Sequence, residues 1–190
     1  MTKKIAIIAS GNGTNAEAIC LYFAESKKID ISLIITDNPN SNLVVIADKF
    51  DIPFILLNKK KKNTDKQLVS NLKKFKINSI VLAGYLKKIS SKVVNLFPNN
   101  IINIHPSLLP KFGGKGMYGE NVHTAVIEAK EMKSGISIHL VNNEYDKGEI
   151  LFQKSCDLSK DETNKTLSKK IQKLEHKYFS SIIEKTFLNK

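Results

Sequence analysis

Short, almost wholly apolar runs alternate with helical patterns between residues 5 and 104, and this alternation constrains the fold more than any other feature of the chain. A run that is apolar at consecutive positions is typical of a strand covered on both faces, as in a parallel sheet between two layers of helices. The sequence therefore predicts an α/β fold with a Rossmann-like, mostly parallel sheet flanked by helices on both faces. The expected strands are residues 5–9, 31–36, 53–57, 79–83 and a run that ends at 104, and the expected helices are 16–26, 43–50, 66–75 and 91–96.

The pattern changes after residue 110. A glycine-rich loop leads into a short helix, and two strands that resemble a hairpin then flank the loop at 142–148. Gly148 permits a tight reversal, so this loop is expected to fold back over the sheet. The expected elements are the loop 111–121, a helix over 122–129, strands over 135–141 and 149–153, and a long helix over 163–188.

Length and charge bound the class of protein. A chain of 190 residues, of which 42% are hydrophobic, can bury one core of ordinary size, so we expect a single domain over residues 1–190. The net charge of +12 is carried entirely by lysine, which accounts for all 30 basic residues. A nucleic-acid-binding surface would be expected to include arginine, whose planar fork binds phosphate and guanine. We therefore interpret the charge as a solvated lysine coat that favours anionic small substrates and not nucleic acid.

Nothing in the sequence indicates a membrane, a secretion signal or a metal. No apolar run approaches the length that crosses a bilayer. The first residues lead straight into the first expected strand, and Cys20 and Cys156 stand alone, without metal-ligand spacing. We expect a cytoplasmic protein with small-molecule partners, no membrane partner and no metal, present as a monomer or a homodimer.

The turn at residues 10–15, Ser-Gly-Asn-Gly-Thr-Asn, lies between the first expected strand and the first expected helix. A helix N-terminus offers free N–H groups to an anion, and glycines let a ligand approach the backbone. The turn therefore predicts a site for a single phosphate. Two other interpretations are a loose dinucleotide fingerprint built from Gly11, Gly13 and Asp37, and a tight turn without a ligand.

A second informative segment is Asn103-Ile104-His105-Pro106-Ser107-Leu108-Leu109-Pro110. Because side chains alternate along a strand, Asn103 and His105 are expected to point together into the space at the strand's end. The two prolines bias the residues before them to an extended conformation. We expect Asp146 to face His105 from the loop at 142–148, to favour the imidazolium and so to raise the pKa of His105.

These three side chains predict acyl chemistry without a covalent enzyme intermediate. The His105–Asp146 pair suits proton transfer near neutral pH, and the Asn103 amide suits a developing oxyanion. A serine elbow, a phosphate-loop lysine and a paired-cysteine or zinc motif are all absent from the sequence. The pattern therefore favours direct transfer of an acyl-type carbon to the amine of a second substrate. The remaining histidines, His123, His139 and His176, are interpreted as structural or surface residues.

Several segments resemble the phosphoribosylglycinamide formyltransferase family of purine synthesis. They are residues 10–15, 82–86, 103–110 and 135–141, together with Asp146-x-Gly148 and Gln153. The match extends from residue 5 to about residue 178. The resemblance implies a formyltransferase fold and transfer of a formyl group from 10-formyltetrahydrofolate, a cosubstrate, to the amine of 5-phosphoribosylglycinamide.

The resemblance also implies a role for particular residues. His105 would be the general acid, Asn103 would hold the oxyanion, and Asp146 would tune His105. Residues of about 1–100 would then bind phosphate, and residues of about 101–190 would carry catalysis and the folate. The implied substrate-binding residues are Gly13, Thr14, Asn15 and Glu175, the last on the ribose hydroxyls. The implied folate-binding residues are Lys61, Leu86, Lys87, Lys88, Ile89, Asn103, Asn142, Asn143, Glu144, Tyr145 and Asp146.

Two other functions stay open from the sequence alone. A related folate-dependent hydrolase would release formate from formyltetrahydrofolate to water. A Rossmann-type nucleotide-binding protein would use Gly11, Gly13 and Asp37 but would leave the three catalytic candidates unexplained. Dependence of folate turnover on the ribonucleotide separates the first alternative, and titration with NAD(H) separates the second.

Overall fold

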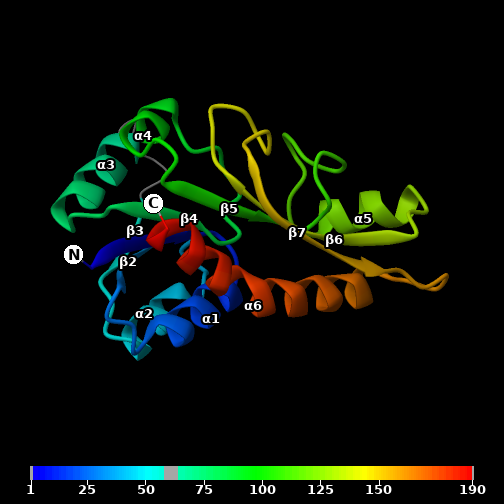
Figure 1. Cartoon of the computed structure of the whole chain (residues 1–190), viewed down its shortest axis with the longest axis horizontal. Coiled ribbons are helices and arrows are strands. Elements are labelled where there is room, and N and C mark those ends of the chain that lie inside the picture. Colours follow the sequence, from blue (N-terminus) through cyan, green and yellow to red (C-terminus); the bar gives the residue numbers. More distant parts are fainter. Residues whose placement is uncertain (1, 58–63, 190) are drawn as a thin grey trace.

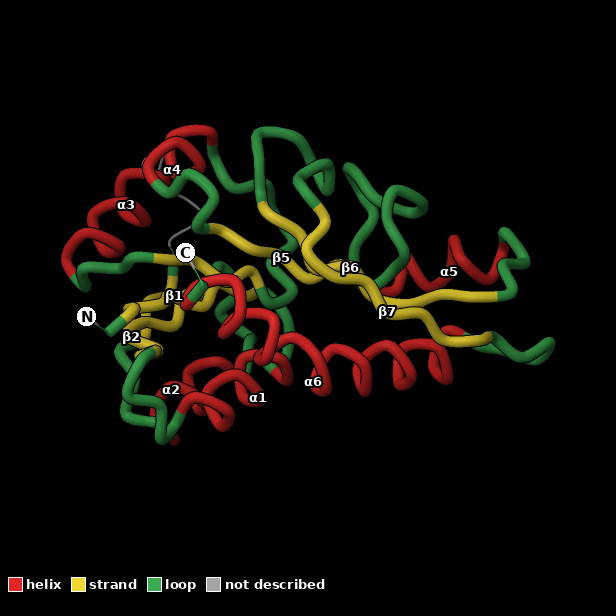
Figure 2. The backbone as a smooth tube through the Cα atoms, in the orientation of Figure 1, coloured by secondary structure: helices red, strands yellow, loops and turns green. Residues whose placement is uncertain are grey.

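The computed structural model of the chain describes residues 2–57 and 64–189. At its centre lies a seven-stranded sheet with the order β3-β2-β1-β4-β5-β6-β7 (Figures 1 and 2). The strands are β1 (Lys3–Ala9), β2 (Ile29–Thr36), β3 (Phe54–Leu56), β4 (Ser79–Leu82), β5 (Ile101–His105), β6 (Lys133–Leu140) and β7 (Ile150–Asp157). The helices are α1 (Thr14–Phe23), α2 (Leu43–Lys49), α3 (Thr64–Lys74), α4 (Ser91–Leu96), α5 (Glu120–Glu128) and α6 (Asn164–Leu188).

Strand pairing changes direction at β5. From β3 across to β5 all neighbours run parallel, whereas β6 pairs antiparallel with β5, and β7 pairs antiparallel with β6. The predicted α/β fold with a mostly parallel sheet is confirmed, as is the hairpin-like pair near the end of the chain. β7 is longer than predicted, because its pairing with β6 continues as far as Lys133 opposite Asp157.

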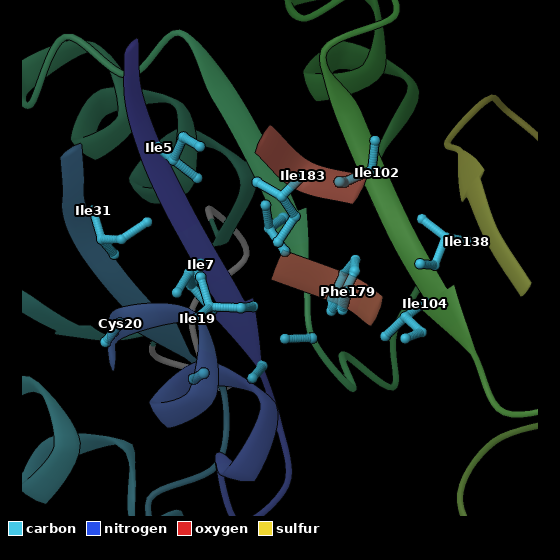
Figure 3. Close-up of a cluster of buried hydrophobic side chains, with 14 of the residues drawn as sticks. Ile5, Ile7, Ile19, Cys20, Ile31, Ile102, Ile104, Ile138, Phe179 and Ile183 are labelled. Carbon is cyan, nitrogen blue, oxygen red and sulfur yellow. The ribbon is translucent and has the colours of Figure 1, made fainter. Parts of the chain in front are cut away.

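Helices cover both faces of the sheet, as predicted. Helices α1, α2, α5 and α6 contribute to one buried cluster, and α3 and α4 contribute to the other. Alternate residues of β1 face the two clusters, Ile5 and Ile7 the first, Ala6 and Ile8 the second. Figure 3 shows Phe179 of α6 among the isoleucines of the first cluster. No helix within residues 2–57 and 64–189 combines the length and apolar character needed to cross a membrane.

The order of the strands creates a switch point between β1 and β4. The chain runs outward from β1 through β2 to β3, and then returns to place β4 on the other side of β1. In sheets of this kind, ligands bind outside the carboxyl ends of the strands at the switch point. The turn after β1 meets the end of β4 there, where the N–H of Ser10 donates to the Gly84 carbonyl at 3.0 Å. The fold thus places both sequence motifs at one edge of the sheet.

Candidate active site

A cavity of about 540 Å³ lies at this edge, lined by residues that follow or end β1, β4 and β5. The rest of the lining comes from β6, the loop after it, α6, the glycine-rich loop at residues 114–119 and α5. The fold thereby gathers most of the predicted site residues from distant parts of the chain into one space. Those that line it are Asn15, Leu86, Lys87, Lys88, Ile89, Asn103, His105, Asn142, Glu144, Tyr145, Asp146 and Glu175.

His105, the last residue of β5, is anchored by the loop that follows it. The residue is 3% exposed, and its Nε2 lies 2.7 Å from the carbonyl oxygen of Phe112. Because a carbonyl oxygen only accepts, Nε2 carries the proton in this bond. In the neutral ring, Nδ1 therefore holds a free lone pair, and it faces Oδ2 of Asp146 at 3.7 Å. Nδ1 is therefore the ring nitrogen that is free to exchange a proton.

His139 of β6 lies directly opposite Asn103 of β5 in the antiparallel register. Nδ1 of His139 lies 2.8 Å from the Leu140 carbonyl oxygen, so Nδ1 carries the proton and Nε2 is an acceptor. Nδ2 of Asn103 donates to that Nε2 across 3.0 Å. The second N–H of the Asn103 amide stays available for an oxygen atom in the cavity.

Asp146 faces both imidazoles from the loop after β6. Its Oδ2 lies 3.7 Å from His105 Nδ1, and its Oδ1 lies 3.6 Å from His139 Nε2. The N–H of Gly114 donates to Oδ2 at 2.8 Å. The backbone of Asp146 has a φ of 54°, in the left-handed region that costs an L-residue about 1–2 kcal/mol. In this loop conformation the two carboxylate oxygens each lie near one of the two rings.

Asp146 does raise the pKa of His105, as expected, but the net shift of that pKa is downward. Burial lowers the pKa of His105 below its ordinary value, and the attraction of Asp146 and the Phe112 carbonyl offsets this only in part. For Asp146 the balance is the reverse. Burial raises its pKa, but the two histidines and the N–H of Gly114 outweigh this, so the pKa lies below its ordinary value. At neutral pH the pair is therefore a neutral imidazole beside a carboxylate. In this state the imidazole can accept a proton.

The other end of the cavity is formed by α1 and α6. Nδ2 of Asn15 donates to Oε2 of Glu175 at 2.9 Å, and Nε2 of Gln172 donates to the Thr14 hydroxyl at 3.2 Å. Oδ1 of Asn15 is buried and has no hydrogen-bond partner in the described part of the chain. Burial raises the pKa of Glu175 to about 7, and the bond from Asn15 offsets this only in part. This end therefore offers a polar ligand an unpaired amide oxygen and a weakly acidic carboxyl group.

The glycine-rich turn divides its work between two glycines. A Cβ at Gly13 would lie 2.6 Å from Ile46 Cδ1 of α2, and the φ of Gly13 is 83°, so this glycine lets the turn pack on α2. Gly11 has open space around it and lines the cavity. Of the predicted phosphate-binding residues, Asn15 lines the cavity, whereas Gly13 and Thr14 lie beside it.

The segment after β4 forms one wall of the cavity, to which all of residues 86–89 contribute. The amine of Lys87 lies 3.0 Å from Oδ2 of Asp37, and the amine of Lys88 lies 5.7 Å from the centre of the Tyr145 ring. Asp37 is 3% exposed. The dinucleotide interpretation requires this carboxylate to be presented to a ribose, and its burial prevents that.

The loop after β6 forms the facing wall. Residues 142–146, apart from the exposed Asn143, line the cavity. The loop folds back against the sheet, as predicted, and a Cβ at Gly148 would lie only 1.6 Å from the Leu140 carbonyl oxygen. Glycine is thus the residue that this close approach allows. Lys61, the remaining predicted folate contact, lies outside the described residues.

Two histidines that the sequence pattern assigned to structural positions belong to the cavity lining, which corrects that interpretation. His139 contacts Asn103, and His123 of α5 is 5% exposed with no hydrogen-bond partner for its Nδ1 among the described residues. A signal for His139 exists, because Ser137 and His139 are polar residues that alternate with apolar ones along β6. His176 is exposed on α6, as expected.

Comparison with known proteins identifies the family. The family described as "Formyl transferase" matches residues 3–183 of the chain. The chain belongs to the formyl transferase family. The matched range spans every strand of the sheet and all the residues that line the cavity.

Relatives within this family carry the name phosphoribosylglycinamide formyltransferase. The Bacillus subtilis (strain 168) protein is 34% identical over 96% of this chain and 93% of its own length. The chloroplastic protein of Arabidopsis thaliana is 37% identical over 95% of this chain, which spans 64% of that relative. The crystal structure of the Bacillus halodurans protein has a TM-score of 0.88 at 33% identity, over 98% of this chain and 96% of that one. The resemblance drawn from the sequence motifs is thereby confirmed.

Proposed function

We propose that this protein transfers a formyl group from 10-formyltetrahydrofolate to the amine of 5-phosphoribosylglycinamide in de novo purine biosynthesis. The observation that carries the proposal is the cluster of Asn103, His105 and Asp146 at one end of a cavity whose other end meets the turn at residues 10–15. Membership of the formyl transferase family and the names of the relatives support it.

In the proposed reaction, the amine attacks the formyl carbon and the carbonyl electrons move to oxygen. We assign the free N–H of Asn103 to this oxygen, where one such donor is worth about 10²- to 10³-fold in rate. The bond from the tetrahedral carbon to N10 of the folate then breaks. N10 leaves with the electron pair and needs a proton.

We assign that proton to His105. Its Nδ1 takes a proton from the attacking amine and gives it to N10, so the transfer balances without a net release. Asp146 stabilises the imidazolium that exists between the two steps. Because burial lowers the pKa of His105, the ring is neutral before the reaction. It becomes the general acid only after it has taken up the proton of the amine.

Substrate binding is assigned to the two remaining parts of the cavity. The phosphate is placed at the N-terminus of α1, with Gly13, Thr14 and Asn15, and the ribose hydroxyls are placed on Glu175. The folate is placed between the facing walls. Its proposed contacts are Leu86, Lys87, Lys88, Ile89, Asn103, Asn142, Asn143, Glu144, Tyr145 and Asp146, with Lys61 as a further candidate. We propose that one domain over residues 1–190 does this work, in the cytoplasm, as a monomer or homodimer.

The test is turnover of the purified protein with both substrates, measured by the absorbance of the deformylated folate. We expect consumption of formylfolate only when the ribonucleotide is present. His105→Ala should reduce kcat by about 10²- to 10⁴-fold, and His176→Ala, at an exposed position of α6, is the matched control. Consumption without the ribonucleotide would indicate the hydrolase instead. Full turnover by His105→Ala would contradict the role of this residue.

A further inference from the structure

Asp37 is a buried carboxylate that the proposed reaction does not use. It directly follows β2, is 3% exposed and is not among the residues that line the cavity. Burying a carboxylate costs free energy unless charged or hydrogen-bonding partners compensate for the lost water. The partners of Asp37 therefore indicate what the residue is for.

Two of these partners come from different parts of the chain, one beside the turn at residues 10–15 and one in the wall at residues 86–89. Oδ1 of Asp37 accepts a hydrogen bond from the Ser10 hydroxyl at 2.7 Å. Oδ2 lies 3.0 Å from the amine of Lys87. Ser10 leads into the glycine-rich turn, and Lys87 belongs to the wall at residues 86–89. Asp37 thus joins the turn to the wall from behind, without lining the cavity itself.

A hydrogen bond from a backbone N–H to the Ser10 hydroxyl closes this connection into a ring. The Ser10 hydroxyl accepts from the N–H of Leu86 at 3.2 Å, and the N–H of Ser10 donates to the Gly84 carbonyl at 3.0 Å. The ring therefore runs from Ser10 to Asp37, on to Lys87, and back through Leu86 to Ser10. Charge-assisted hydrogen bonds are strong and directional. A shift of the turn at residues 10–15 therefore displaces the wall at residues 86–89, and the reverse holds too.

The loop after β2 also fixes the turn itself. Nδ2 of Asn38 donates to the Ser10 carbonyl at 2.9 Å, and the Ser41 hydroxyl donates to the Gly11 carbonyl at 2.6 Å. Gly11 lines the cavity. The loop that carries Asp37 thus holds the substrate end of the cavity through side chains and the folate wall through Lys87.

We propose that Asp37 is a positioning residue that couples the turn at residues 10–15 to the wall at residues 86–89. A ligand at the turn and a folate at that wall then strengthen each other's binding. The identity of the two ligands rests on the proposed function. Order imposed on one wall by its ligand is transmitted through Ser10, Asp37 and Lys87, and the second ligand then meets a wall that is already ordered. Such coupling is reciprocal, because each ligand must change the affinity of the other by the same factor.

The experiment measures the dissociation constant of 5-phosphoribosylglycinamide with and without tetrahydrofolate, which lacks the formyl group and cannot react. The reverse titration is measured as well. In the wild-type protein we expect each ligand to tighten the other by about fivefold or more. In Asp37→Asn this factor should fall towards one, because the amide is neutral and has one acceptor oxygen where the carboxylate offers one each to Ser10 and Lys87. KM should rise for both substrates, with a smaller change in kcat. Asp30→Asn, at the exposed start of β2, is the matched control and should keep the wild-type factor.

Ser10→Ala provides a second variant that leaves the Asp37–Lys87 pair in place but removes the hydroxyl between Asp37 and Leu86. It should lose the mutual effect too, and it decides the question if Asp37→Asn does not fold. The inference is overturned if the two ligands bind independently in the wild-type protein. It is also overturned if the variants melt at lower temperature but keep the mutual effect. In either case wild-type turnover would leave the proposed function standing, whereas absence of turnover would remove that function itself.

Discussion

Asp146 and Glu175 line opposite ends of one cavity, and burial acts on both carboxyl groups in the same direction. At the end near β5 and β6, two imidazoles and a backbone N–H surround Asp146, and its pKa falls below its ordinary value in spite of burial. At the end near α1 and α6, the hydrogen bond from Asn15 is not enough, and burial raises the pKa of Glu175 to about 7.

The contrast shows that neighbouring donors and charges, and not burial alone, set the charge of a carboxyl group inside a site. Groups whose environments push their pKa values apart mark a division of labour. Asp146 stays charged throughout the neutral range and can stabilise a protonated His105. Glu175 changes charge near neutrality, so it can make ligand binding at its end depend on pH.

The largest effect is expected from Asp146→Asn. Removal of the charge deprives the imidazolium of His105 of its stabilising partner, so kcat should fall by about 10²-fold or more while KM changes little. Steady-state kinetics at neutral pH measure this. Asp157→Asn is the control, because that side chain is 85% exposed at the end of β7. A normal kcat in Asp146→Asn would contradict the claim that the charge of Asp146 stabilises the protonated His105.

A smaller effect is expected from Glu175→Gln, and it should appear in KM. Below a pH of about 7 the carboxyl group of Glu175 is protonated, and above it the group is a carboxylate that accepts strongly from ribose hydroxyls. The KM for the ribonucleotide should therefore fall as the pH rises through about 7. In the glutamine variant this dependence should be flat, and KM at pH 8 should be about tenfold higher than in the wild type, the value of one charged hydrogen bond. Glu184→Gln on the same helix is the control, and the same slope in both variants would contradict the assignment.

The smallest effect concerns stability, where the two ends should give opposite signs. A carboxyl group with a lowered pKa stabilises the fold at high pH, and that contribution is lost as the pH falls through the folded-state pKa. One with a raised pKa favours the fold at low pH, and its contribution is lost as the pH rises through about 7. At pH 8, Asp146→Asn should thus lower Tm and Glu175→Gln should raise it, each by about 2–5 °C. Thermal melting at pH 8 and pH 4 measures both, and shifts of equal sign at pH 8 would refute the contrast.

Much of the fold follows from the sequence because the apolar strand runs encode burial on both faces. The alternation of β5 placed Asn103 and His105 on one side, and both line the cavity. The glycine-rich turn and the loop closed by Gly148 were also found from local patterns. These predictions succeed because turn chemistry and strand alternation depend on neighbouring residues only.

Other features depend on residues far apart in the chain and could not be predicted. The contact of His139 with Asn103 requires the antiparallel register of β5 and β6, which no local pattern specifies. The direction of the pKa of His105 depends on how deeply the fold buries the ring, and burial exceeds the attraction of Asp146. The partners of Asp37 likewise come from two loops that meet only at the switch point of the sheet.

The hydrogen bond between His105 Nε2 and the Phe112 carbonyl leaves Nδ1 as the one ring nitrogen that can exchange protons. Whatever arrives at Nδ1 must also depart from Nδ1, because the ring cannot turn over without giving up that bond. Under the proposed chemistry, the substrate amine that gives up the proton and the folate N10 that receives it must both lie within reach of His105 Nδ1 at the same time. Both reactants therefore have to enter before either product leaves, and the kinetics should be those of a ternary complex.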